Sequence, residues 1–255
     1  MSYVIAFAGK GGTGKTTLAG LTIRYLIENR GKPVLAVDAD SNACLNEALG
    51  VPVHATIGNL REESLETIRK GGDRPGGMSA EQLFDYQVQQ SVIESKGFDL
   101  LVMGRPEGPG CYCAANNIIR KYTDKLSDDY SYVVLDNEAG MEHMSRRTTH
   151  TVDLLFIISD PTVKGVLTAE RIKNLADELK LEVGKKVLII NRINEERIKE
   201  QEKTLKIPDS EAHDFVPDDE NISRIDLAGK SVFELPPDSK ALRTLYGILD
   251  SLSIP

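Results

Sequence analysis

A glycine-rich segment near the N-terminus has residues suited to binding phosphate groups. Segment 9–17 reads GKGGTGKTT and satisfies the pattern G-x-x-x-x-G-K-S/T. Backbone N–H groups of such a loop wrap the phosphates, Lys15 reaches the β and γ phosphates, and Thr16 offers its hydroxyl to Mg²⁺. The segment lies between an apolar run and a helical one, which favours this interpretation over a glycine-rich turn without nucleotide. The predicted nucleotide-binding residues of this loop are Gly9, Lys10, Gly11, Gly12, Thr13, Gly14, Lys15, Thr16 and Thr17.

Carboxylates at the ends of two further apolar runs can hold Mg²⁺ beside the phosphate-binding loop. Asp38 ends the run 33–38, Asp40 follows two residues later, and Asp136 ends the run 132–136. A carboxylate at the end of such a strand holds Mg²⁺, usually through water, when a phosphate-binding loop is also present. The alternative interpretation of Asp38 and Asp40 is that they cap the next helix.

Cys111 and Cys113 form a C-x-C pair after a glycine- and proline-rich turn and directly before a predicted helix. A thiol near a helix N-terminus has a depressed pKa, which favours the thiolate that binds soft or borderline metals. Two sulfurs make half of a tetrahedral site, and a symmetric dimer would supply the other half. A redox pair and unreactive buried thiols are the alternatives. Cys44 has no cysteine close to it in the sequence, so we expect it in the core.

The elements that must position these side chains alternate along the chain. Short runs rich in Val, Ile and Leu are typical of strands buried on both faces, and the longer amphipathic segments between them are typical of helices. The alternation predicts an α/β fold with a single doubly wound, mainly parallel sheet flanked by helices, in which ligands bind at the carboxyl ends of the strands. The predicted strands are 3–8, 33–38, 98–104, 132–136, 154–159 and 186–191, and the predicted helices are 15–29, 114–126, 167–179 and 239–252.

The length of the chain fits one domain. We interpret residues 1–255 as a single domain with one large buried core. The segment from about 56 to 96 differs from the rest because it is polar and contains several glycines and a proline. We expect helical pieces here that cover one side of the sheet.

Composition limits the partners. The formal net charge is -8, which argues against a broad basic face for nucleic acid or an anionic membrane. The N-terminal residues have no basic segment or cleavage site typical of a secretory signal, and no apolar stretch approaches the roughly 20 residues that cross a bilayer. The cysteines do not form a disulfide framework, so we expect a cytoplasmic protein without nucleic-acid or membrane partners.

The phosphate-binding loop resembles the deviant Walker A motif of the MinD, ParA and nitrogenase-iron-protein class, within the P-loop NTPase fold. Lys10, the early lysine of the motif, carries the resemblance. The resemblance implies an ATPase that binds ATP or ADP with Mg²⁺, and a homodimer in which Lys10 reaches the partner's nucleotide. It further implies that Asp40 positions the attacking water and that Asp38 supports Mg²⁺. In the sequence D-x-x-A-G after Asp136, it implies that the Gly140 amide senses the γ-phosphate.

Two later segments resemble the adenine-binding positions of the same class. Asn191 and Arg192 end one predicted strand, and Pro217 and Asp219 follow a further, short strand that we also predict before them. The resemblance implies that these residues flank the base and that the asparagine reads its edge. GTP-selective P-loop proteins usually carry an N/T-K-x-D motif, which the sequence from Asn191 does not match. A turn or helix cap is the alternative interpretation of Asn191.

The chain around the cysteine pair resembles the CooC family of nickel-inserting accessory ATPases for carbon monoxide dehydrogenase. The segments 105–113, 136–143 and 145–147 carry this resemblance. It implies that Cys111 and Cys113 bind Ni²⁺ or Zn²⁺ across a homodimer, and that the ATP cycle delivers nickel to carbon monoxide dehydrogenase. Three alternatives stay open: maturation of acetyl-CoA synthase or another nickel enzyme, spatial organisation of the MinD or ParA kind, and electron transfer as in the nitrogenase iron protein.

Overall fold

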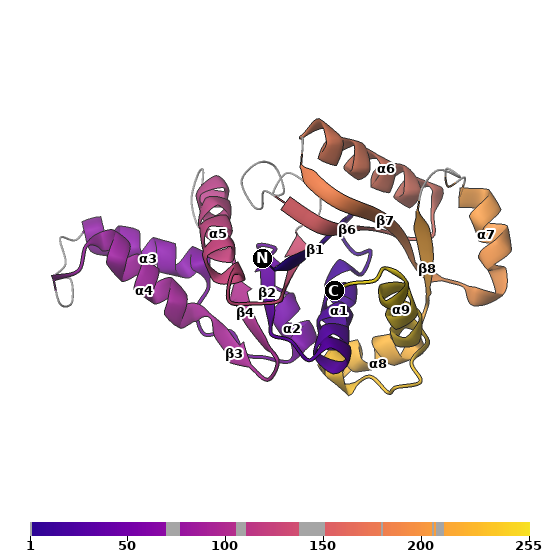
Figure 1. Cartoon of the computed structure of the whole chain (residues 1–255), viewed down its shortest axis with the longest axis horizontal. Coiled ribbons are helices and arrows are strands. Elements are labelled where there is room, and N and C mark those ends of the chain that lie inside the picture. Colours follow the sequence, from indigo (N-terminus) through magenta and orange to yellow (C-terminus); the bar gives the residue numbers. More distant parts are fainter. Residues whose placement is uncertain are drawn as a thin grey trace.

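The computed structural model describes residues 2–69, 77–105, 111–137, 151–179, 181–205, 207 and 212–255, with the backbone alone at 67–69, 80, 111–116 and 197. Within these ranges an eight-stranded sheet forms the centre of the molecule, in the order β3-β4-β2-β5-β1-β6-β7-β8 (Figure 1). Adjacent strands are parallel except that β3 runs antiparallel to β4. The strands are β1 (Tyr3–Gly9), β2 (Val34–Ala39), β3 (Ile93–Ser95), β4 (Phe98–Val102), β5 (Tyr132–Asn137), β6 (Thr151–Ser159), β7 (Glu182–Ile193) and β8 (His213–Pro217).

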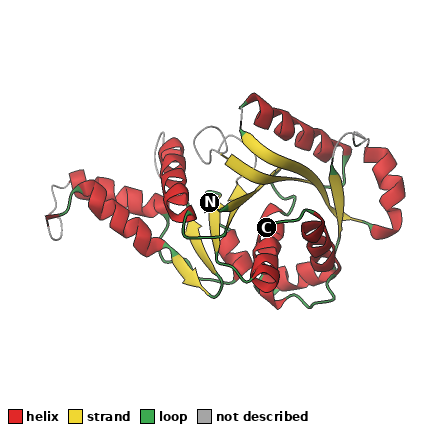
Figure 2. Cartoon of the chain, in the orientation of Figure 1, coloured by secondary structure: helices red, strands yellow, loops and turns green. Residues whose placement is uncertain are grey.

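Helices cover both faces of the sheet (Figure 2). One hydrophobic cluster joins the sheet to α1 (Lys15–Arg30), α2 (Leu45–Leu49), α8 (Glu220–Leu227) and α9 (Lys240–Ser251), beside the short 3-10 helix η3 (Val232–Glu234). A second cluster joins the opposite face to α3 (Ile57–Arg69), α4 (Ala80–Ser91), α5 (Cys111–Ser127), α6 (Val163–Glu178) and α7 (Ile198–Leu205), which follows the 3-10 helix η2 (Glu195–Arg197). The sheet is therefore buried on both faces, as the continuous apolar runs require.

The predicted fold class is confirmed: the sheet is mainly parallel and helices flank it. The main difference is β3, a three-residue antiparallel edge strand that the sequence analysis did not identify. Its residues are partly exposed, so it lacks the apolar run that marks the buried strands. The predicted strand 154–159 begins earlier, at Thr151, and the predicted strand 186–191 extends from Glu182 to Ile193.

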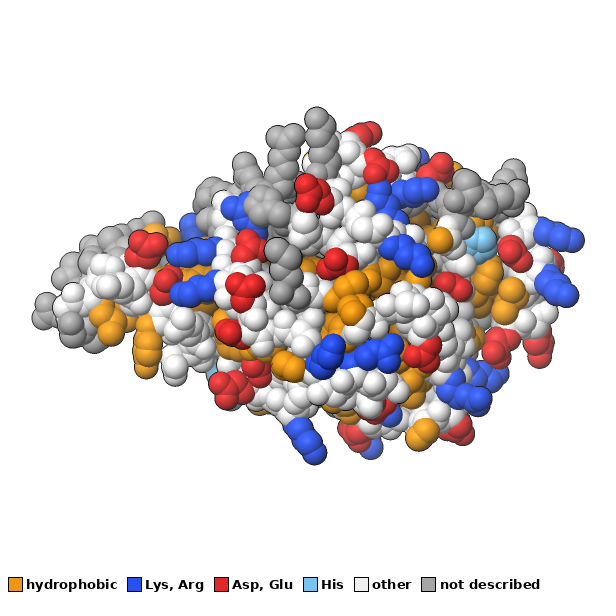
Figure 3. All heavy atoms as spheres, in the orientation of Figure 1, with side chains coloured by type: hydrophobic (Ala, Val, Ile, Leu, Met, Phe, Trp, Pro, Cys, Tyr) orange, Lys and Arg blue, Asp and Glu red, His pale blue; other side chains and the backbone are white. Residues whose placement is uncertain are grey.

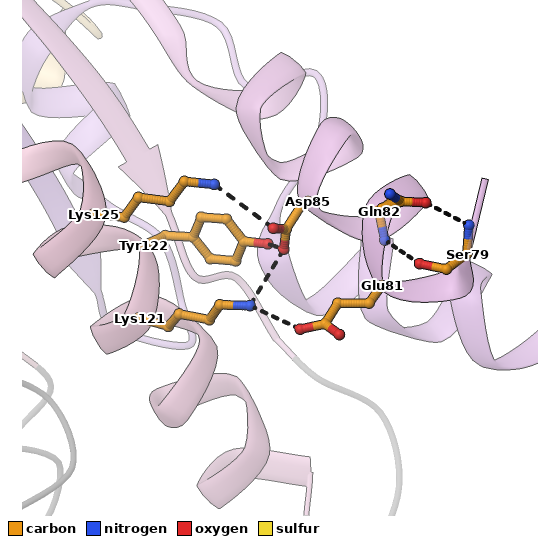
Figure 4. A network of polar contacts seen from close by, with 7 residues as sticks. All are labelled: Ser79, Glu81, Gln82, Asp85, Lys121, Tyr122 and Lys125. Carbon is orange, nitrogen blue, oxygen red and sulfur yellow. Dashed lines mark hydrogen bonds and ion pairs between the residues drawn. The ribbon is translucent and has the colours of Figure 1, made fainter.

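The polar segment 56–96 forms α3, α4 and β3, and polar contacts hold α4 against α5 (Figure 4). Asp85 of α4 accepts a hydrogen bond from the Tyr122 hydroxyl of α5. The same carboxylate forms ion pairs with Lys121 at 3.4 Å and Lys125 at 3.6 Å. This contact fixes the two-helix segment to α5, the helix that begins at Cys111.

The outer surface carries charges of both signs. In Figure 3, Lys and Arg side chains are interspersed with Asp and Glu side chains over the described part of the visible face. The apolar face of the C-terminal helix α9 is buried, with Leu242, Leu245 and Leu249 in the core. Among the helices that the structure describes, none is long and apolar enough to cross a membrane.

Candidate functional site

The glycine-rich segment forms a loop between the carboxyl end of β1 and the start of α1. Gly14 precedes α1 in a left-handed conformation, and α1 begins at Lys15. The side chains of Thr13 and Lys15 both donate to the carbonyl of Lys10, at 2.9 and 3.4 Å. Lys15 is 7% exposed, so its ammonium lies inside the loop. The loop residues thus surround a position where backbone N–H groups and one buried cation can meet phosphate oxygens.

The side chain of Lys10 has a different environment. Lys10 is exposed, and no hydrogen bond or ion pair joins its ammonium to another residue that the structure describes. The two lysines of the loop are therefore not equivalent: Lys15 points into the loop of its own chain, whereas Lys10 is available to an external group.

Thr16, in the first turn of α1, meets Asp136, near the carboxyl end of β5. The Thr16 hydroxyl donates to Oδ2 of Asp136 at 2.6 Å. The other carboxylate oxygen, Oδ1, is buried and has no hydrogen-bond partner among the described residues. A buried acceptor without a donor is costly unless a cation or water satisfies it. A carboxylate beside a hydroxyl provides the oxygen ligands that Mg²⁺ prefers, so these residues fit a Mg²⁺ ion.

Asp38 lies beside Asp136, because the two residues are register partners on β2 and β5. Its carboxylate accepts hydrogen bonds from the backbone N–H groups of Asp40 at 3.0 Å and Leu45 at 2.8 Å. Leu45 is the first residue of α2, so the helix-cap interpretation of Asp38 describes part of its role. Asp40, in turn, accepts from the backbone N–H and the side-chain amide of Asn42. These contacts hold the segment after β2 in a fixed loop.

The two buried carboxylates have raised pKa values. Burial, together with the adjacent charge of Asp136, raises the pKa of Asp38 to about 7. Burial also raises the pKa of Asp136 to about 6, although the Thr16 hydrogen bond and the charge of Lys15 oppose the shift. Both groups therefore gain protons in the folded protein near neutral pH when no cation is bound.

We expect the nucleotide-free protein to lose stability as the pH rises from about 6 to about 8. The pKa of Asp38 is raised from 3.8 to about 7, so its stabilising contribution is present at low pH and is lost as the pH passes through the folded-state value. Over this interval the ionisation of Asp38 alone lowers the free energy of unfolding by about 1.4 kcal/mol. Thermal unfolding in EDTA should show a decrease in Tm of about 3–6 °C.

The variant Asp38→Asn provides the control for this pH dependence. Its amide does not titrate, so the slope of Tm against pH should become smaller, whatever its absolute Tm. An unchanged slope in Asp38→Asn would show that groups other than Asp38 cause the pH dependence of Tm. Because Mg²⁺ competes with protons for the carboxylates, adding Mg²⁺ should stabilise the wild type more at the higher pH.

The predicted adenine-binding residues meet at the carboxyl ends of β7 and β8. The side-chain amide of Asn191 donates to the carbonyl of Thr13 at 2.8 Å, and the guanidinium of Arg192 donates to the carbonyl of Gly12 at 3.2 Å. Asn191, Arg192, Pro217 and Asp219 line one cavity together with Thr17, Leu18, Asp218, Ile222, Ser223 and Asp226. The end of β7 is therefore tied to the phosphate-binding loop. Since the Asn191 N–H₂ group is already engaged, its carbonyl oxygen remains to accept from a ligand.

Asp219 connects elements around this cavity. Its carboxylate accepts hydrogen bonds from the Ser239 hydroxyl at 2.6 Å and from the backbone N–H groups of Asn221 and Ala241. Burial alone would raise the pKa of Asp219, but these hydrogen bonds outweigh burial and lower it. Asp219 is thus engaged in joining the start of α8 to the start of α9. The sequence motifs did not point to α8, whose residues Ile222, Ser223 and Asp226 also line the cavity.

Several predicted residues fall at or beyond the limits of the described chain. Gly140 lies outside the described residues, as do the side chains of Cys111 and Cys113. The backbone of the cysteine pair corrects one expectation: α5 begins at Cys111, so the pair lies within the helix and not before it. Cys44, expected in the core, is exposed because the N-terminus of α2 lies at the surface. The described side chains contain no group of three or more His, Cys, Asp or Glu arranged to hold a metal ion.

Known nucleotide-binding proteins are similar to this chain in sequence and in fold. Residues 4–232 match the model of the CobQ/CobB/MinD/ParA nucleotide binding domain. An uncharacterized ATP-binding protein of Methanocaldococcus jannaschii is 38% identical over 252 residues, 98% of each chain. The carbon monoxide dehydrogenase accessory protein CooC of Rhodospirillum rubrum is 34% identical over 183 residues, 69% of each chain. The structure of the septum site-determining protein MinD with Mg-ADP from Pyrococcus horikoshii has the same fold, with a TM-score of 0.69, 19% identity and coverage of 99% of this chain and 96% of that one.

Proposed function

Because the chain belongs to the CobQ/CobB/MinD/ParA nucleotide-binding family, whose members are ATP-binding proteins of the ATPase type, we propose that it is an ATP-hydrolysing metallochaperone. The proposed protein is a homodimer that binds Ni²⁺ or Zn²⁺ through Cys111 and Cys113. Its client is carbon monoxide dehydrogenase, whose active-site cluster receives the nickel. The observation that carries this proposal is the 34% identity to CooC over 69% of both chains.

The nucleotide site supports the ATPase part of the proposal. Mg²⁺, held by Thr16 and Asp136 with Asp38 beside them, would neutralise charge on the β and γ phosphates. Lys15 binds the same phosphates from within the loop, and Asp40 orients the water that attacks the γ-phosphate. These residues lie at the carboxyl ends of β1, β2 and β5, where a ligand of a doubly wound sheet binds.

Two residues outside this group complete the proposed phosphate site. Lys10, exposed on its own chain, reaches the nucleotide of the partner subunit and stabilises the charge that develops during transfer. The Gly140 amide senses the γ-phosphate. Together they make hydrolysis depend on the closed dimer.

The base pocket supports ATP as the nucleotide. The N–H₂ group of Asn191 donates to the carbonyl of Thr13. The side-chain carbonyl oxygen of Asn191 is therefore the group left to accept a hydrogen bond from the base. Adenine presents an exocyclic amino donor at the position where guanine presents a carbonyl acceptor. An acceptor held in this orientation therefore favours adenine, because guanine would leave two acceptors facing each other.

Backbone contacts connect the phosphate site to the helix of the cysteine pair. The N–H of Met103, just after β4, donates to the carbonyl of Asp38 at 2.8 Å, and the carbonyl of Met103 accepts from Gly58. The chain that follows leads to α5, which begins at Cys111. A movement of the segment after Asp38 would therefore reach Met103, eight residues before Cys111 in the sequence. This route supports coupling between ATP turnover and the cysteine pair.

The spatial-organiser alternative has less support. Likeness to MinD and ParA structures below 25% identity concerns the fold alone. Membrane attachment through a terminal amphipathic helix requires an accessible apolar face. The apolar side chains of α9 are buried, which argues against α9 as such an anchor.

The double variant Cys111→Ala/Cys113→Ala tests the metal part of the proposal. Anaerobic wild-type protein titrated with Ni²⁺ or Zn²⁺ should bind about one ion per two chains and form a dimer, since a four-thiolate site needs both subunits. The double variant should lose at least about tenfold in metal affinity while its ADP affinity is retained, because its ligands are gone and its phosphate loop is intact. Metal content and mass in solution measure both effects.

The exposed thiol of Cys44 provides the matched control. The variant Cys44→Ala also removes one thiol, but it should bind metal as the wild type does. Unchanged metal stoichiometry in Cys111→Ala/Cys113→Ala would overturn the cysteine site. ATP-dependent sedimentation of the wild type with liposomes or DNA would instead favour the spatial-organiser alternative.

A further inference from the structure

β3 lies at one end of the sheet, directly after α4, and has a free edge (Figure 1). It pairs with β4 alone, in antiparallel register, and no backbone hydrogen bond joins it to another element that the structure describes. In an antiparallel pair the backbone groups of alternate residues point away from the partner strand. Part of the N–H and C=O groups of β3 therefore face outward, which is the arrangement that accepts a further strand.

A cavity of about 320 Å³ lies beside β3. Its lining residues come from segments 51–55 and 90–94, so the end of α4 and the start of β3 line it together with the chain between α2 and α3. Val51 and Ile93 pack against the hydrophobic cluster on one face of the sheet, and Ala55 and Val92 pack against the cluster on the opposite face. The cavity therefore lies where the two faces meet, at the edge of the sheet.

The surface around this cavity carries few charges. Segments 51–55 and 86–93 contain no Asp, Glu, Lys or Arg, although these residues make up 27% of the chain. Tyr86 is 53% exposed, and Gln89 and Gln90 are exposed beside it on α4. Depletion of charge together with an accessible tyrosine is typical of the central part of a protein–protein interface. The same segments lack the basic residues that nucleic acid or an anionic membrane requires.

The chemical groups at this edge point to a polypeptide as the occupant. The outward N–H and C=O groups of β3 match the backbone of an extended chain, and the side-chain amide of Gln90 offers both a donor and an acceptor. The apolar part of the cavity lining suits one aliphatic or aromatic side chain of that chain. Glu94 is the one acid among the described lining residues, and it disfavours a second acid beside the cavity.

We propose that this edge binds an extended segment of a partner protein, which pairs with β3 and places one apolar side chain in the cavity. β3 has three residues and offers few backbone hydrogen bonds, so the buried side chain supplies most of the affinity. The residues of the partner next to that side chain are uncharged, as the surrounding surface is. The site shares no lining residue with the base cavity, and this inference does not rest on the proposed function.

Selection from a phage-displayed library of random peptides tests the proposal on the full chain. Selection on the wild type, with counter-selection on Gln90→Arg, should enrich peptides that share an apolar residue between uncharged neighbours. Gln90→Arg places a bulky cation in the cavity lining, and Gln90 is exposed on α4, so this variant should fold. A synthetic peptide of the enriched sequence should bind the wild type at least about tenfold more tightly than Gln90→Arg.

Gln89→Arg is the matched control, because Gln89 is exposed in the same turn of α4 but does not line the cavity. It should bind the peptide as the wild type does. Ala55→Trp fills the cavity from the other segment and should weaken binding as Gln90→Arg does. In the wild-type complex the amide hydrogens of Ile93–Ser95 should exchange about tenfold more slowly or better, since strand pairing engages them.

Three results would each overturn the proposal: no enriched peptide, equal peptide affinity of the wild type and Gln90→Arg, or unchanged amide exchange at β3. A dimer that forms with rising concentration in the absence of metal and nucleotide, and that Gln90→Arg abolishes, would assign the edge to a second copy of this chain instead. The Tm of each variant should stay close to that of the wild type, which separates a loss of binding from a loss of folding.

Discussion

Lys10→Ala is expected to reduce ATP hydrolysis at least about 100-fold while nucleotide affinity changes little. The ammonium of Lys10 is exposed and makes no hydrogen bond or ion pair with the described residues of its own chain, so its removal should not disturb the fold or the phosphate loop. Its proposed action is on the partner's nucleotide, where a cation stabilises charge that develops only in the transition state. Single-turnover hydrolysis and ADP titration separate the two effects.

Lys15→Ala is the informative comparison, because Lys15 lies inside the loop. This variant should lose nucleotide affinity as well as hydrolysis. The cross-subunit role is tested by mixing Lys10→Ala with Asp40→Ala, which are both expected to be inactive alone. A mixed dimer has one site with Asp40 in place and Lys10 supplied by the other subunit, so part of the activity should return. No recovery in the mixture would contradict action across the dimer.

Gly9→Ala is expected to destabilise the whole protein. Gly9 has φ of +153°, and a Cβ atom at this position would lie 2.3 Å from the carbonyl oxygen of Ile158. That oxygen belongs to the backbone of β6, which pairs with β1, so neither partner can move without breaking the sheet. Backbone strain and overpacking together cost roughly 3 kcal/mol or more. Thermal unfolding without nucleotide should show Tm lowered by about 6–12 °C, or an insoluble product.

Gly12→Ala separates this effect from phosphate binding. Gly12 also has positive φ, at +80°, but a Cβ atom would meet nothing within 4 Å. Only the backbone strain of about 1–2 kcal/mol remains, so Gly12→Ala should fold. It should still lose nucleotide affinity, because the loop must close around the phosphates. Equal Tm values for the two variants would contradict the assignment of Gly9 to the β1–β6 contact.

The central strands of the sheet could be predicted because residues adjacent in the sequence are enough to identify each of them. Strands such as β2 and β5 are buried on both faces, so each is a continuous apolar run in the sequence, and the site carboxylates Asp38 and Asp136 follow at their ends. β3 gave no such signal, because three partly exposed residues at the sheet edge need no apolar run. The predicted start of α5 was three residues too late, because the glycine- and proline-rich sequence before Cys111 does not mark which residue begins the helix.

The contacts within the site were harder to predict from the sequence. Motif spacing predicted which residues approach the phosphates, but the hydrogen bonds from Asp40 and Leu45 that engage Asp38 depend on the path of the loop after β2. The exposure of Cys44 depends on where α2 begins. Ile222, Ser223 and Asp226 of α8 belong to no motif, and their place in the lining of the base cavity depends on how the chain folds after β8.

The position of β1 in the middle of the sheet has a consequence for biosynthesis. β1 leaves the ribosome before its two neighbours in the sheet, β5 and β6, which begin at Tyr132 and Thr151. The phosphate-binding loop therefore lacks its supporting strands until β5 and β6 have been translated. Contacts between residues so distant in sequence form slowly, and an unpaired apolar strand is prone to aggregate. The nascent chain thus has to keep β1 from associating with other chains before it can bind nucleotide.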